Sequence, residues 1–172
     1  MSGALPEYLD LTKAGQAPLR LTGQLNLNGL RRLGEAVTDS GGQAHVDLQV
    51  FDAGGRKVVW GRVQADLSLT CQRCFGKLGV PVTADFNLAW VRRAEEAARL
   101  PETYEPLISA DGRVQLADVI EEELLLALPM VARHERPSEC GKMIPRASRP
   151  RAGAVDVALV KPFAALKALK RR

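Results

Sequence analysis

The stretch RKVVWGRVQADLSLTCQRCFGKLGVPVTADFNLAWV, residues 56–91, decides the expected fold of this chain. Apolar and polar residues alternate along both of its halves, as Val63, Ala65 and Leu67 illustrate before the cysteines. A period of two is typical of a strand that buries one face. The Cys-x-x-Cys of residues 71–74 therefore lies between two strands, at the tip of an expected hairpin.

The residues before this stretch predict two more strands and a short helix. Residues 18–27 and 44–51 alternate in the same way, and the second run passes through a glycine turn into the opening stretch as a long hairpin. Between the two runs the period changes to that of a helix. Asn28 is its expected N-cap, and the SGG of residues 40–42 is its expected end.

The residues after the opening stretch predict the main helix. Residues 92–113 are charged and contain two prolines, so we expect a surface excursion with a short helix before Pro101. Residues 116–128, LADVIEEELLLAL, have apolar side chains at helical spacing, and Pro129 stops them. The glutamates at 121–123 point in different directions on a helix, which indicates a solvated face.

These patterns together predict an α+β fold, in which an antiparallel sheet packs with one main helix. We expect a single domain over residues 1–134 and a basic, partly flexible C-terminal segment over residues 135–172. That segment ends in a short amphipathic helix, in which Phe163, Leu166 and Leu169 are spaced by three.

The length and composition exclude several classes of protein. No apolar run in the 172 residues approaches the roughly 20 that a membrane helix needs, and the N-terminus has no signal-peptide pattern, so we expect a cytoplasmic protein. Aromatic residues make up 5% of the chain, which argues against a large surface for stacking bases. Motifs such as G-x-x-x-x-G-K-[ST], G-x-S-x-G and H-E-x-x-H are absent from the sequence, and we expect no enzyme.

Charge is distributed unevenly along the chain. Residues 133–172 hold 11 basic and 3 acidic residues, which leaves residues 1–132 acidic in a chain of net charge +4. A basic end favours a polyanionic partner such as RNA, and the alternative is a solubilising tail. The expected nucleic-acid contacts are Arg146, Arg149, Arg151, Lys170, Arg171 and Arg172. The apolar stripe of Phe163, Leu166 and Leu169 could instead dock on a partner protein or fold back on the chain's own core.

The cysteines at 71 and 74 leave three interpretations open. A redox pair of the thioredoxin type requires the first cysteine at a helix N-terminus, and a hairpin tip does not supply that context. A tight turn between strands suits two thiolates that bind a structural zinc ion, and His134 and Cys140 are the candidates for the other two ligands. The third interpretation is cysteines that only pack. We expect the other histidine, His45, to be an exposed strand residue.

Four motifs together resemble the bacterial YceD-like family of large ribosomal RNA subunit accumulation proteins. The motifs are LTCQRC at 69–74, LPETYEPL at 100–107, ADVIEEELLLALPMVARH at 117–134 leading to the SEC of 138–140, and KPFAALKALKRR at 161–172. They follow the family's order and spacing, over about two thirds of the chain.

The resemblance implies a non-enzymatic factor that supports accumulation or processing of large-subunit (23S) ribosomal RNA. Its partner would be that RNA or a pre-ribosomal assembly protein. The cysteine pair and the later cysteine are recurring family positions, and some members carry further cysteines near Cys140. This chain lacks them, so a complete zinc site must use His134. The alternative function is a redox or metal-handling protein that uses Cys71 and Cys74 as an exchangeable pair.

Overall fold

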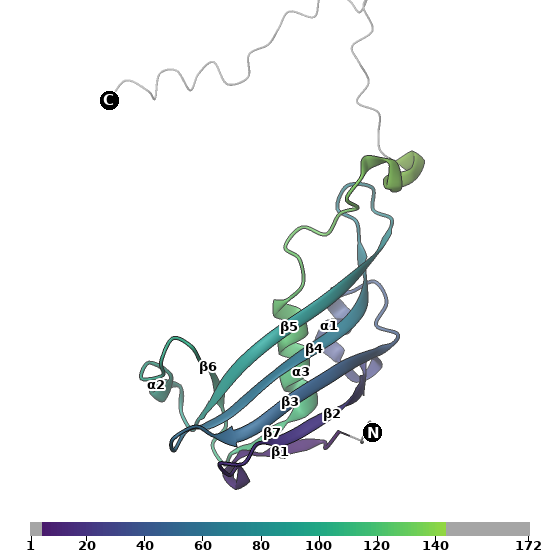
Figure 1. Ribbon diagram of the computed structural model, residues 1–172. Coiled ribbons are helices and arrows are strands. Elements are labelled where there is room, and N and C mark those ends of the chain that lie inside the picture. The colour runs from purple at the N-terminus through teal and green to yellow at the C-terminus, as the bar shows by residue number, and fades with distance from the viewer. Residues whose placement is uncertain (1–4, 144–172) are drawn as a thin grey trace, which may run out of the picture.

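A five-stranded sheet forms the centre of the molecule (Figure 1). The computed structural model describes residues 5–143, with side chains as far as Cys140. In spatial order the strands are β2 (Leu19–Asn26), β3 (Gln43–Asp52), β4 (Lys57–Thr70), β5 (Lys77–Val91) and β6 (Glu105–Ile108). The pairs β2–β3, β3–β4 and β4–β5 are antiparallel, and the short edge strand β6 runs parallel to β5. The expected antiparallel sheet with its long hairpin is therefore confirmed.

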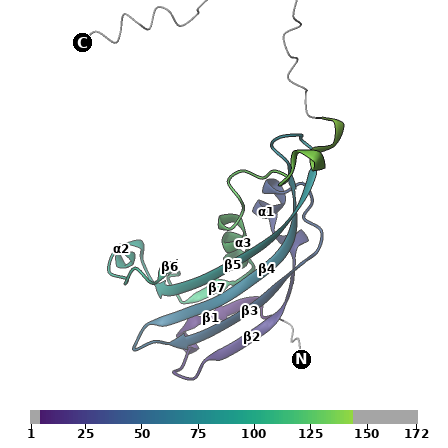
Figure 2. The same cartoon turned by 45° about the horizontal axis from the view of Figure 1, so that its top comes forward.

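Helices cover one face of this sheet, as Figures 1 and 2 show from two directions. The main helix α3 (Leu116–Leu126) packs on β4 and β5, and α1 (Arg31–Ala36) packs on α3. The short helix α2 (Ala94–Ala97) lies in the excursion between β5 and β6. The described residues also contain three stretches of 3-10 helix, which are η1 (Leu11–Lys13), η2 (Leu27–Gly29) and η3 (Pro137–Met143). None of the helices in residues 5–143 is long and apolar enough to cross a membrane.

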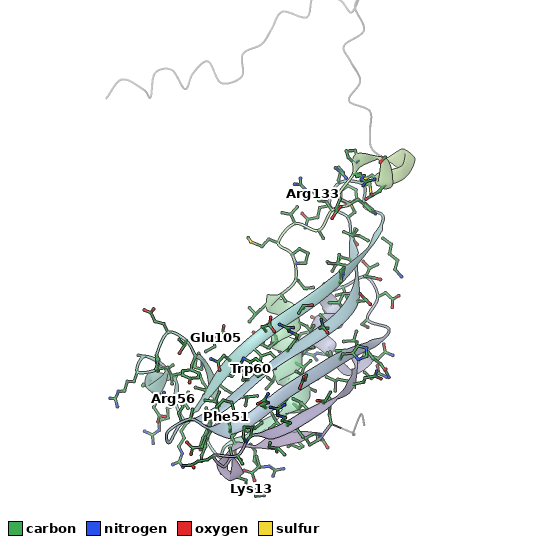
Figure 3. All side chains as sticks on the ribbon, viewed as in Figure 1. Lys13, Phe51, Arg56, Trp60, Glu105 and Arg133 are labelled. Atoms are coloured by element: carbon green, nitrogen blue, oxygen red, sulfur yellow. The ribbon has the colours of Figure 1, made fainter. Side chains whose placement is uncertain are left out.

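The hydrophobic core lies between the sheet and α3. Leu48 and Val63 point inward from β3 and β4, and Ile120 and Leu124 meet them from the helix, all with no more than traces of exposed surface. The opposite face of the sheet is polar and solvated, as is common for antiparallel sheets. Trp60, labelled in Figure 3, lies on this outer face and is half exposed. The alternation of apolar and polar residues in the sequence therefore gives the sheet one buried face and one solvent-exposed face.

Three small strands were not predicted from the sequence. Strand β1 (Tyr8–Asp10) pairs with β7 (Arg113–Gln115) as a separate antiparallel ribbon, next to the start of α3. Strand β6 was likewise missed, since it lies within the surface excursion predicted for residues 92–113. Three or four residues are too short to display a period, so a local pattern gives no signal for such strands.

The N-terminus of α1 differs from its prediction. Asn28 does not cap this helix, because the residue at the N-cap position is Leu30, which supplies no side-chain hydrogen bond. Instead, Glu121 of α3 accepts a hydrogen bond from the backbone N–H of Leu33, at 3.0 Å, and another from Nε of Arg32, also at 3.0 Å. A free N–H group in the first turn of α1 is thus satisfied by a carboxylate from a distant helix.

The solvated face predicted for residues 121–123 is wrong for two of its three members. Glu121 and Glu123 are buried, with 6% and 7% of their surface exposed, and only Glu122 is exposed. Burial raises the pKa of Glu121, but the Leu33 N–H and the Arg32 guanidinium outweigh it and hold that pKa below its ordinary value. The Glu121 carboxylate can be buried because α1 supplies its hydrogen-bond donors. The local sequence around residue 121 gives no sign of these donors.

Candidate metal centre

The Cys-x-x-Cys forms the turn between β4 and β5. The backbone N–H of Cys71 donates to the carbonyl of Gly76 at 2.8 Å, and the N–H of Phe75 donates to the carbonyl of Cys71 at 2.8 Å. Phe75 has a φ of 59°, a left-handed conformation that costs a residue with a side chain about 1 kcal/mol. The predicted hairpin tip is therefore confirmed. This tight turn places the sulfurs of Cys71 and Cys74 on the same side of the hairpin tip, where both belong to one buried cluster.

The chain beyond α3 returns to this tip. The N–H of Gln72 donates to the carbonyl of Ala132 at 2.8 Å, and Nη2 of Arg73 donates to the carbonyl of His134 at 2.8 Å. Figure 2 shows η3 beside the β4–β5 turn. These hydrogen bonds hold residues 132–140 against the hairpin tip.

Four donor side chains converge where the two segments meet. They are Cys71, Cys74, His134 and Cys140, and their ligand atoms all lie within 4.8 Å of one another. The ring atom Nδ1 of His134 lies 3.6 Å from Sγ of Cys74 and 3.6 Å from Sγ of Cys140. The three cysteines are buried, and His134 is half-buried.

Backbone amides at the tip favour thiolates. Burial raises the pKa of the Cys71 thiol, but hydrogen bonds from the N–H groups of His134, Arg73 and Cys74 outweigh it and lower that pKa to about 5. The pKa of Cys74 is raised. The Gly76 N–H lowers it, but burial and the neighbouring Cys71 and Cys140 raise it by more. Three sulfurs this close cannot all ionise freely without a cation among them.

Arg73, between the paired cysteines, lies beside the same sulfurs. Its Nε donates to Sγ of Cys140 at 3.0 Å. A divalent ion bound by three thiolates and a neutral imidazole carries one net negative charge, and this guanidinium would offset it. Sequence reasoning passed over this residue, although an arginine inside a Cys-x-x-Cys was the available signal.

Four protein donors in a buried cluster can hold one metal ion with no position left open for a substrate. Such a centre links the hairpin tip to the segment after α3, which are about 60 residues apart in the chain. The arrangement is suited to a structural role.

The other sequence-predicted residues lie elsewhere. His45 is on the outer face of β3, where its ring lies 3.4 Å from the side-chain amide of Gln24, and it is exposed as expected. Two groups of predicted contacts lie outside the described residues. They are the basic residues Arg146, Arg149, Arg151, Lys170, Arg171 and Arg172, and the apolar residues Phe163, Leu166 and Leu169.

Comparisons with known proteins cover most of the chain. The family described as "Large ribosomal RNA subunit accumulation protein YceD" matches residues 59–170. A curated protein from Haemophilus influenzae, named "Large ribosomal RNA subunit accumulation protein YceD", is 36% identical over 132 residues, which is 76% of each chain. No solved structure matches.

Proposed function

The chain belongs to the YceD family of large ribosomal RNA subunit accumulation proteins, and from that premise we propose that it is a non-enzymatic ribosome-biogenesis factor acting on large-subunit (23S) RNA in the cytoplasm. The family match carries this proposal, because it spans the hairpin tip, the main helix and the basic end. The name of the Haemophilus influenzae relative supports it. Under this proposal the partner is large-subunit ribosomal RNA or a protein of the pre-ribosomal particle.

We further propose that the four-donor cluster binds one structural zinc ion. Tetrahedral zinc, with Zn–S near 2.3 Å and Zn–N near 2.0 Å, places a sulfur and a nitrogen about 3.5 Å apart. The observed separations of 3.6 Å between Nδ1 of His134 and two sulfurs agree with this geometry. The soft donor set of three thiols and one imidazole also favours zinc over magnesium or calcium.

Two matched histidine variants test the zinc site. Purified protein should contain about one zinc per chain, and His134→Gln, which removes a proposed direct ligand, should lower zinc affinity by more than the roughly 10-fold to 100-fold that loss of an outer-shell partner costs. His45→Gln is the control, because His45 is exposed on the outer face of β3. Elemental analysis and competition with a chromophoric chelator provide the measurements. Equal zinc affinity in the two variants would exclude His134 as a ligand.

The proposed zinc site would give the basic segment a fixed starting point. The described chain ends at Met143 in η3, directly beside the cluster. The residues that follow include Arg146, Arg149 and Arg151. We propose that these arginines, with the basic residues 170–172, contact phosphates of ribosomal RNA, since contacts of this kind release counterions.

Salt dependence tests this contact. Arg146, Arg149 and Arg151 are replaced together by alanine, and binding to a large-subunit ribosomal RNA fragment is measured at several salt concentrations. Three lost phosphate contacts should reduce the slope of log affinity against log salt by about 2 to 3. The control replaces Arg20, Arg93 and Arg99, which are exposed on the body. A tail variant that binds like this control shows that the arginines do not contact the RNA.

A second candidate function rests on the closeness of the three thiols. A redox or metal-handling protein would use Cys71 and Cys74 as an exchangeable pair, and both are buried within one cluster. Thiol titration separates the candidates. Zinc-protected thiols favour the structural site, whereas metal-free protein with a readily reduced disulfide favours the redox function. In the described structure neither cysteine lies at a helix N-terminus, the position that activates redox thiols.

A further inference from the structure

A groove of about 270 Å³ lies between α3 and β6, away from the metal centre. Its apolar walls include Leu88 of β5, Leu107 of β6 and Leu126 of α3, and Leu126 is 67% exposed. Three carboxylates line the same groove, from Glu105, Glu122 and Glu123. Figure 3 shows Glu105 beside β5 and far from Arg133, which lies near the hairpin tip.

Glu123 is the unusual member of this groove, because it is largely buried and forms no ion pair with any residue that the structure describes. Only 7% of its surface is exposed. The ion pairs among residues 5–143 include Glu122, which binds Arg32 at 2.7 Å, but neither Glu105 nor Glu123. Burial, with Glu105 and Glu122 nearby, raises the pKa of Glu123 to about 7. No side-chain oxygen in the described part of the chain is fully buried without a hydrogen-bond partner, so the Glu123 carboxylate keeps contact with the solvent in the groove and can be reached by a cation from that side.

The lining of the groove defines the chemistry of its occupant. An exposed leucine beside unpaired carboxylates suits a segment with apolar side chains on one face and lysines next to them. The C-terminal stretch KPFAALKALKRR, residues 161–172, has this composition. Its apolar residues are spaced by three, and Lys167 and Lys170 lie close to them in the sequence.

We propose that this acidic groove binds the C-terminal segment of the same chain, with Phe163 and Leu166 against Leu107 and Leu126 and a lysine beside Glu123. The 17 residues from 144 to 160 connect this segment to Met143. They can span up to about 60 Å when extended. Leu88 lies 11 residues along β5 from the tip, which is about 36 Å, so the segment can reach the groove.

Docking within one chain has an advantage over binding from solution. A tethered segment meets its groove at an effective concentration in the millimolar range, so weak contacts suffice. On the proposed function, the same basic residues also contact RNA, and RNA would then release the segment from the groove.

A photo-crosslinking experiment on the full chain tests the docking. Phe163 is replaced by p-benzoylphenylalanine, and the crosslinked residues are identified by mass spectrometry without RNA. We expect crosslinks within one chain to residues 105–107 or 119–126, with a yield that dilution does not change. The same photo-reactive residue at Ala168, on the opposite face of a helix from the apolar stripe, should crosslink at least fivefold less. Crosslinks to a second copy, to other parts of the body or to nothing would overturn the proposal.

Two exposed positions provide matched groove variants that should not disturb the core. Leu126→Asp adds a negative charge at the groove wall, and we expect the crosslink yield to fall at least fivefold because the apolar contact is lost. Met130→Asp is the control, because Met130 is 96% exposed and lies outside the groove. Equal yields in the two variants would overturn the proposal.

Adding the ribosomal RNA fragment separates the docking from the proposed function. A crosslink that forms without RNA and disappears with RNA supports both. A crosslink that persists while RNA binds supports the docking and shows that the segment does not contact RNA. RNA binding without any crosslink in the RNA-free protein overturns the docking alone.

Discussion

The body of the molecule and its hairpin tip are stabilised in different ways. In the body, buried residues of β3, β4, β5 and α3 form one large apolar core. At the tip, the buried cluster consists of Cys71, Cys74 and Cys140, with the partly buried Leu78 as its hydrophobic neighbour. A fully buried leucine or valine contributes about 1.5 to 3 kcal/mol through the hydrophobic effect. Apolar burial can therefore hold the body, whereas under the proposed zinc site the order of the tip would depend on the bound ion.

The largest expected effect comes from removing one of the proposed zinc ligands at the tip. Cys74→Ser replaces a thiolate by a hydroxyl, which is a poor zinc ligand, and zinc affinity should fall by at least about 100-fold. The Gln72 amide, which donates to Ala132, should then exchange rapidly with solvent. Amides of β3 and β4 should stay protected, and hydrogen exchange by NMR gives both readings. Loss of protection in β3 would show that the body, too, depends on zinc binding at the tip.

The second largest effect is expected from a substitution that opens a cavity in the core of the body. Leu48 is fully buried on β3, and Leu48→Ala should lower the free energy of unfolding by about 2 to 5 kcal/mol. Zinc affinity should not change, because the tip shares no buried residue with this core. Urea unfolding and chelator competition measure the two quantities. A parallel fall in zinc affinity would show that the two regions are coupled.

A smaller effect concerns the contact between α3 and α1. Glu121→Gln keeps an acceptor for Leu33 but removes the charge that faces Arg32, and stability at pH 7 should fall by about 1 to 2 kcal/mol. The pKa of Glu121 is lowered in the folded state, so its contribution is present above about pH 4.5 and is lost as pH falls through the lowered pKa. The deficit should therefore shrink in acid. Glu102→Gln is the matched control, because Glu102 is exposed and forms no ion pair among the described residues, and unfolding is measured against pH.

The smallest expected effect comes from relieving backbone strain in the turn beside the proposed zinc ligands. Phe75→Gly removes a left-handed conformation that costs about 1 kcal/mol, and zinc affinity should rise by up to about fivefold. Phe75 is 76% exposed, so little packing is lost. Gln72→Gly lies in the same turn without a positive φ, and it should weaken binding slightly. An affinity that falls in Phe75→Gly would mean that the phenyl ring stabilises the tip.

Sequence reasoning worked where neighbouring residues carry the information. The alternation through Val63, Ala65 and Leu67 predicted β4, because a strand with one buried and one solvent-exposed face alternates apolar and polar residues along its own sequence. The same reasoning failed at Glu121, whose burial depends on α1, some 90 residues earlier in the chain. It also failed at β6, which pairs in parallel with β5 and is too short to show a period. Local patterns report a residue's own environment, and they do not report its distant partners.

The sequence by itself determined the long hairpin, the place of Cys71 and Cys74 at its tip, the main helix and the basic end, since each is a property of contiguous residues. It also supplied His134 and Cys140 as candidates, with no means of placing them. Only the tertiary structure decided that His134 and Cys140 meet the paired cysteines. Their position depends on the direction in which the chain leaves α3 and on the hydrogen bonds from the hairpin tip to residues 132–134. Contacts between segments about 60 residues apart are determined by tertiary packing, and local sequence patterns carry no information about such packing.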